Sequence, residues 1–236
     1  MRRIGIIGAM AQEVAALAAR LEQPRTHAHA GSTFHQGRLH GVEVMVLQSG
    51  IGKVNAAVGT VLMLETFQPD AIINTGSAGG FGEGLEIGDI VVSSEVRHHD
   101  VDATVFGYEH GQVPSLPAAF RSDERLVEVA RQCIRELGEV RVVEGLIATG
   151  DVFMACPELV ARTRARFPTM LAADMEAAAI AQVCHLYGCP FVVTRALSDI
   201  AGSDDNHLSF DTFLERAAEH STRMVSAMVK RLGASG

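Results

Sequence analysis

A few acidic residues stand where apolar segments of this chain end. Glu13, Glu176 and Asp199 follow the segments "IGIIGAMAQ", "LAADM" and "FVVTRALS". Carboxyl groups that converge on one ligand can serve as general acid and general base. The chemistry that these residues suggest is therefore proton transfer to and from a small molecule.

These acids can act together only if the fold brings the segment ends to one place. In a parallel sheet covered by helices, ligands bind outside the carboxyl ends of the strands. The polar residues at the expected strand ends are Glu13, Ser77, Asp151, Glu176, Arg195, Ser198 and Asp199. Their convergence, more than any single residue, predicts an active site at that edge of the sheet.

Each of these residues also has an ordinary structural explanation. Asp199 in "LSD" could cap a helix or close an Asx turn. Glu13 could be a solvated acid near the positive end of a helix dipole, and Ser77 a small residue in a tight turn. Asp174 precedes Glu176 by two residues and should point elsewhere, so we expect it to be structural, as a helix cap. The local sequence leaves the first three alternatives open.

Two further patterns imitate cofactor or metal sites. "GIIGAM" lacks the third glycine of the dinucleotide fingerprint. The adjacent His98 and His99 should point to opposite faces of a strand and cannot easily share one ion. We therefore expect no cofactor and no metal ion.

Composition narrows the classes further. The chain has 236 residues, is 47% hydrophobic and carries a formal net charge of -8, which does not suit a nucleic-acid partner. The four cysteines form no CxxC pair, so we expect reduced thiols and a cytoplasmic location. The apolar N-terminal run is too short for a signal peptide and is interrupted by Glu13. No segment approaches the roughly 20 apolar residues that span a bilayer.

Strand-like and helix-like segments alternate without a linker or repeat. Strands are expected at residues 3–9, 71–80, 88–99, 141–151, 171–173 and 190–199, with a hairpin at 31–50 that turns at His40-Gly41. Helices are expected at 10–22, 53–67, 123–137, 157–167, after Glu176, and at 209–232, with Pro157 starting one and Ser209 as an N-cap. Residues 101–119 look irregular. The pattern predicts one α/β domain over residues 1–236, with a central mixed, mostly parallel sheet flanked by helices.

A family resemblance rests on motifs that occur in order along the chain. They are "IGIIGAM..E", "SGIGKVNAA", "INTGSAGG", "GDIVVS", "HHDVDATVFGYEHGQVP", "TGDVF", "DMEAAAIAQV", "FVVTRALSD" and "HLSF". The chain closely resembles the bacterial 5'-methylthioadenosine/S-adenosylhomocysteine nucleosidases of the purine nucleoside phosphorylase-like superfamily. The resemblance implies a three-layer sandwich and hydrolysis of the bond between adenine N9 and ribose C1'.

The resemblance also implies roles for single residues. Asp199 would protonate adenine N7, with Ser198 orienting its side chain. Glu13 would activate the attacking water, with Arg195 nearby. Glu176 would accept the ribose hydroxyls and favour the cationic sugar.

Other positions are implied to bind the substrate. Ser77 would lie near the ribose and the water, Met175 against sugar and base, Phe153 on adenine, and the main chain of Met154 at the adenine edge. The 5'-thio pocket would be lined by Met10, Ile51 and Phe210, and by Ala103, Phe106, Tyr108 and Pro114 of a second subunit. The family often has valine at the Ala103 position, so the pocket is expected to be roomier here. An ordinary core role is the alternative for each apolar residue.

The resemblance further implies a homodimer with shared active sites, a nucleoside substrate and a place in methionine salvage. Three other functions stay open at this point. They are a phosphate-dependent purine nucleoside phosphorylase, an aminodeoxyfutalosine-type nucleosidase, and a noncatalytic nucleoside-binding module. The first would need an arginine-rich anion cradle, which Glu13 opposes.

Overall fold

The computed structural model describes residues 1–138, 140–202 and 206–234, without the side chains of residues 206–211 and 216. Its strands are β1 (Arg3–Gly8), β2 (Glu22–His29), β3 (Ser32–Leu39), β4 (Val42–Gln48), β5 (Ala71–Gly80), β6 (Ile90–His98), β7 (Phe120–Arg121), β8 (Val142–Thr149), β9 (Met170–Asp174) and β10 (Phe191–Ile200). Its helices are α1 (Ala11–Ala18), α2 (Lys53–Thr66), the 3₁₀ turn η1 (Thr104–Phe106), α3 (Glu124–Leu137), α4 (Pro157–Arg166), α5 (Ala177–Tyr187) and α6 (Asn206–Ala234).

The strands in the described part of the chain form a single sheet. Its order is β10-β6-β8-β9-β5-β1-β4-β3-β2, with β7 on β6. Because β10 also pairs with β5, the strands β5, β10, β6, β8 and β9 close into a ring. Among the described pairings, five are parallel and five antiparallel, so the sheet is more evenly mixed than the sequence suggests.

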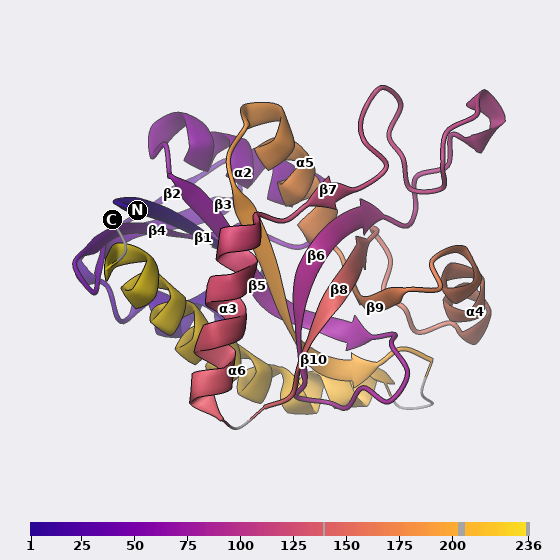
Figure 1. The fold of residues 1–236 in the computed structure, drawn as a ribbon. Coiled ribbons are helices and arrows are strands. Elements are labelled where there is room, and N and C mark those ends of the chain that lie inside the picture. Colours follow the sequence, from indigo (N-terminus) through magenta and orange to yellow (C-terminus); the bar gives the residue numbers. More distant parts are fainter. Residues whose placement is uncertain (139, 203–205, 235–236) are drawn as a thin grey trace.

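Helices cover both faces of this sheet, as Figure 1 shows. On one face α1, α3 and α6 bury a cluster that includes Leu17, Leu126 and Met228. On the other face α2 and α5 bury a second cluster around Met63 and Ile180. Central strands such as β1 are therefore apolar on both sides, which explains the continuous run "IGIIG" in place of an alternating pattern.

The predicted single α/β architecture and most of the predicted elements are confirmed. The hairpin turns at His40 and Gly41, which both have positive φ as a tight two-residue turn requires. Pro157 is the first residue of α4. The N-cap assigned to Ser209 is wrong, because α6 already begins at Asn206.

Two strands were not predicted, the two-residue β7 and the longer β2. The sequence suggests a helix as far as residue 22, but α1 ends at Ala18 and β2 begins at Glu22. All eight residues of β2 are exposed, and it is the outermost strand of the sheet. With no apolar side to bury, and with Pro24 inside it, β2 carries no period-2 signal in its sequence.

In the described chain, no helix is both long and apolar enough to cross a membrane.

Candidate active site

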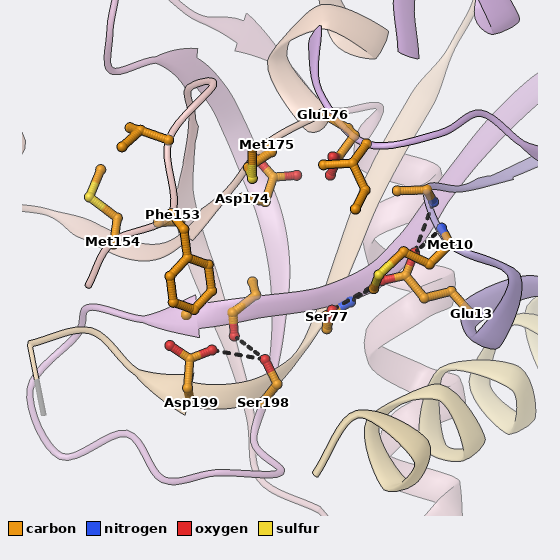
Figure 2. Close-up of a pocket in the computed structure, with 16 residues that line it drawn as sticks. Met10, Glu13, Ser77, Phe153, Met154, Asp174, Met175, Glu176, Ser198 and Asp199 are labelled. Carbon is orange, nitrogen blue, oxygen red and sulfur yellow. Dashed lines mark hydrogen bonds between the residues drawn. The ribbon is translucent and has the colours of Figure 1, made fainter. Parts of the chain in front are cut away.

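A cavity of about 350 Å³ opens at the ends of β1, β5, β9 and β10. Figure 2 shows Ser198 and Asp199 at one end, Glu13 with Met10 at the opposite end, and Glu176 with Met175 along a third side. The lining residues are Ala9, Met10, Glu13, Ile51, Ser77, Ala78, Gly79, Val152, Phe153, Met154, Ala173, Asp174, Met175, Glu176, Ser198 and Asp199. The strand-end rule thus brings most of the predicted residues to one place.

Glu13 is held by four hydrogen bonds. Its Oε2 accepts from the backbone N–H of Ala9 at 2.8 Å and of Met10 at 3.1 Å. Its Oε1 accepts from the N–H of Ser77 at 2.9 Å and from the Ser77 hydroxyl at 3.1 Å. Gly76 must lack a side chain, because a Cβ there would lie 2.8 Å from Oε1 of Glu13. Glu13 is 3% exposed as a residue and its carboxylate is fixed in orientation, unlike the solvated helix acid that was its alternative.

Asp199 lies at the end of β10, where only 2% of the residue is exposed. Its Oδ1 accepts a hydrogen bond from the Ser198 hydroxyl at 2.9 Å. Burial raises the pKa of Asp199 above its ordinary value, and the bond from Ser198 opposes this only in part. A carboxyl group with a raised pKa is suited to be a general acid. Since α6 begins at Asn206, Asp199 is not the N-cap of that helix.

Glu176 is the N-cap residue of α5 and reaches back to the start of α2. Its Oε1 accepts a hydrogen bond from the backbone N–H of Gly52 at 2.9 Å. Burial and the nearby charge of Asp174 raise the pKa of Glu176 to about 8, against the effects of Gly52 N–H and Arg195. A cationic sugar beside this carboxylate would favour its ionised form.

Arg195 is paired in the sheet with Gly76, which borders Glu13, but its guanidinium binds other partners. It is 2% exposed and is not among the residues that line the cavity. Its guanidinium binds Asp174 through Nε at 3.1 Å and Asn74 through Nη2 at 2.7 Å.

Asp174 also accepts from the N–H of Ala177 in the first turn of α5 and from the Thr149 hydroxyl, although the N-cap position itself is Glu176. The expectation that Asp174 points elsewhere is wrong, because it lines the cavity. The buried Arg195 supports it from behind.

The apolar candidates fall into two groups. Met10, Ile51, Phe153, Met154 and Met175 line the cavity, and Phe153 is 42% exposed. The side chain of Phe210 lies outside the described residues. The predicted second-subunit residues Ala103, Phe106, Tyr108 and Pro114 do not line the cavity of their own chain.

Comparison with known proteins identifies the family. The model of the phosphorylase superfamily matches residues 3–230. A protein of Chromohalobacter salexigens named 5'-methylthioadenosine/S-adenosylhomocysteine nucleosidase is 70% identical over 233 residues, which cover 99% of each chain. The chain belongs to the 5'-methylthioadenosine/S-adenosylhomocysteine nucleosidase family. The predicted resemblance is thereby confirmed.

Two solved nucleosidase structures have nearly the same fold. The Neisseria meningitidis enzyme in complex with methylthio-immucillin-A has a TM-score of 0.95 and 46% identity, covering 98% of this chain and 100% of its own. The Colwellia psychrerythraea enzyme in complex with adenine has a TM-score of 0.95 and 52% identity, covering 98% and 96%. The nucleosidase fold therefore extends over essentially the whole of this chain.

The raised pKa of Glu176 predicts a pH-dependent stability for the nucleosidase. A carboxyl group whose folded pKa is about 8, against an ordinary 4.5, stabilises the fold fully below pH 4.5 and loses that contribution as pH rises through 8. Glu176→Gln removes the group that must ionise. We therefore expect the unfolding free energy of the variant, relative to that of wild type, to be about 1–3 kcal/mol larger at pH 9 than at pH 5. Urea unfolding of both proteins at the two pH values measures this, and a difference that does not change with pH would contradict it.

Proposed function

We propose that this protein hydrolyses the N-glycosidic bond of 5'-methylthioadenosine and S-adenosylhomocysteine, releasing adenine and the 5-thioribose product. The observation that carries the proposal is the placement of a raised-pKa carboxyl, Asp199, at the opposite end of one cavity from a carboxylate held by four hydrogen bonds, Glu13. Glycosidic hydrolysis needs such a division between an acid at the leaving group and a base at the water.

The proposed reaction assigns each group one task. Asp199 donates its proton to adenine N7 as the N9–C1' bond breaks, so that the base leaves as a neutral molecule. The positive charge on the sugar is stabilised by Glu176, whose carboxylate accepts the ribose hydroxyls. Glu13 orients a water and takes its proton as the oxygen bonds to C1'. Ser77 holds Glu13, and Ser198 orients Asp199.

The remaining contacts are proposed for recognition. Phe153 stacks on adenine and the main chain of Met154 reads the edge of the base, while Met10, Ile51 and Met175 contact the sugar and its 5' substituent. Arg195 acts behind the cavity: it supports Asp174 and, by its charge, favours the ionised form of Glu176. No described residue of the chain is proposed to hold a cofactor.

Phosphorolysis is the second candidate, and the cavity disfavours it. Among the described lining residues none is basic, whereas four are carboxylic acids. Phosphate recognition ordinarily uses arginines and free backbone N–H groups. Here the N–H groups of Ala9, Met10 and Ser77 are taken by Glu13. An aminodeoxyfutalosine-type substrate differs from 5'-methylthioadenosine only in its 5' substituent. The cavity does not distinguish the two substrates, and an assay must.

Product analysis tests the proposal. The protein is incubated with 5'-methylthioadenosine, S-adenosylhomocysteine or a futalosine-type nucleoside, each with and without phosphate. We expect free adenine and a free thio-sugar from the first two, at rates that phosphate does not change. A sugar 1-phosphate would establish the phosphorylase. Cleavage of the third nucleoside alone would establish the futalosine-type enzyme, and binding without cleavage would establish the noncatalytic module.

We also propose that the enzyme is cytoplasmic and acts in methionine salvage. The free cysteines suit the cytoplasmic location.

We also propose a homodimer whose active sites are shared. The segment between β6 and β7 projects from the body of the molecule (Figure 1), and it exposes 85% of Val105 and 79% of Phe106. Ile51 and Val54, where α2 begins, are exposed as well. Large apolar side chains in such exposed groups are typical of interfaces. In the dimer, Ala103, Phe106, Tyr108 and Pro114 would line the partner's 5'-thio pocket.

The dimer is expected to be required for activity. On dilution, specific activity should fall together with the dimer fraction, because each monomer would lack the far wall of its pocket. Sedimentation velocity and initial rates on one dilution series measure the two quantities. A monomer with full activity at assay concentration would contradict the shared site.

A further inference from the structure

Lys53, Asp100 and Asp151 close a ring of hydrogen bonds beside the cavity. The Lys53 ammonium donates to Oδ1 of Asp100 at 2.7 Å, and the backbone N–H of Asp151 donates to Oδ2 of Asp100 at 3.0 Å. The ring is completed by the backbone N–H of Lys53, which donates to Oδ1 of Asp151 at 2.8 Å. It joins three segments that are distant in sequence: the start of α2, the end of β6 and the loop after β8.

The ring lies beside the group that holds Glu176. Gly52 lies directly before Lys53, and its N–H donates to Oε1 of Glu176 at 2.9 Å. Gly52 has a φ of +96°, which glycine adopts readily and other residues rarely do. A Cβ on Gly52 would lie 3.1 Å from Oδ1 of Asp151. Gly52 therefore packs closely against Asp151 of the ring, while its N–H donates to Glu176.

We propose that Lys53, Asp100 and Asp151 are positioning residues that set the Gly52 N–H, and through it the Glu176 carboxylate, for the sugar of the substrate. The proposal rests on the ribose role of Glu176 proposed above. None of the three ring residues lines the cavity. Its effect is on the place of one carboxylate, and a displacement of about 1 Å in such a group can cost 100-fold in rate.

The charges within the ring support its integrity. Burial by itself raises the pKa of Asp100, but the bonds from Lys53 and from Asp151 N–H outweigh it and keep the pKa below its ordinary value. Asp100 is therefore ionised at neutral pH and can bind the ammonium. Asp151 places a second carboxylate at the N-terminus of α2, where the exposed N–H groups favour negative charge. Both acids act on the same short stretch, Gly52-Lys53.

The test separates the sugar from the base. Lys53→Met removes the ammonium and keeps the length of the side chain. We expect kcat/KM for 5'-methylthioadenosine to fall about 10- to 100-fold, while Ki for the product adenine, which does not reach Glu176, changes by less than about twofold. Lys53→Arg should restore most of the activity because it keeps the charge. Arg131→Gln, which breaks the remote ion pair with Glu144, is the matched control and should behave as wild type.

A double variant decides whether the effect passes through Glu176. Lys53→Met should add almost nothing in the Glu176→Gln background, since groups that act through one another are not additive. Full additivity would overturn the inference, and so would a parallel loss of adenine affinity and melting temperature, which marks a merely structural ring. If Lys53→Met is silent while Glu176→Gln is impaired, the positioning inference fails and the proposed function stands. If Glu176→Gln is as active as wild type, the proposed role of Glu176 fails first.

Discussion

Asp199→Asn is expected to be the most damaging single change at the site, lowering kcat by about 10²–10⁴-fold without unfolding the protein. Adenine leaves poorly as an anion, and protonation at N7 removes that difficulty. Asparagine has nearly the shape of aspartate and can still accept the bond from Ser198. It has no acidic proton to give, so the loss should fall on kcat more than on substrate affinity.

The structure provides a matched comparison for this prediction. Asp174→Asn makes the same chemical change on a buried carboxylate, but one that is paired with the buried Arg195. Breaking that pair leaves a buried guanidinium with less compensating charge, so Asp174→Asn should lower the melting temperature clearly. Asp199→Asn should melt near wild type, because burial disfavours the charge that the change removes.

Three measurements on one preparation decide the case of Asp199: kcat, ligand affinity and melting temperature. A fall of only a few-fold in kcat would show that Asp199 is not the acid. A collapse of kcat together with the melting temperature would make the residue structural.

Most strand-end positions of the site could be predicted from chain order. Alternating strands and helices bring the ends of the parallel strands β1, β5 and β10 to one edge, and Glu13, Ser77 and Asp199 come with them. The end of β9 joins them differently, because β9 pairs antiparallel with the last residues of β5. The chemistry of Glu13 and Asp199 could then be assigned by residue type and by the resemblance. This part of the argument needs no side-chain geometry.

Other parts depend on tertiary contacts that leave no mark in a single sequence. Arg195 stands on the predicted strand, but its long side chain binds Asp174 and Asn74, both on other strands, and so lies behind the cavity. Gly52 was missed because its contribution is a backbone N–H, which every non-proline residue carries. Its only signal is the glycine itself in "SGIGK". The strand β2 was missed because all of its residues are exposed, so its sequence carries no alternation of buried and exposed positions.

Glu13→Gln is expected to lower the hydrolysis rate by about 10²–10⁴-fold, and phosphate is expected to leave the wild-type rate unchanged. Glutamine cannot take a proton from the water. It also fits the local donors badly: both oxygens of Glu13 accept hydrogen bonds, and an amide NH₂ in place of either oxygen would face N–H donors.

Ser77→Ala is the control for that misfit, because it removes the hydroxyl donor and leaves the three backbone donors in place. Ser77→Ala should lower the hydrolysis rate far less than Glu13→Gln does, and its melting temperature shows how much the loss of one contact destabilises the protein.

The same donors explain why phosphate is expected to leave the rate unchanged. They form a small anion cradle, and the carboxylate of Glu13 fills it from within the chain, so an incoming phosphate would meet a negative charge where it needs N–H groups. A variant of near-normal rate, or a sugar 1-phosphate made by the wild type, would refute this assignment of Glu13 and favour the phosphorylase.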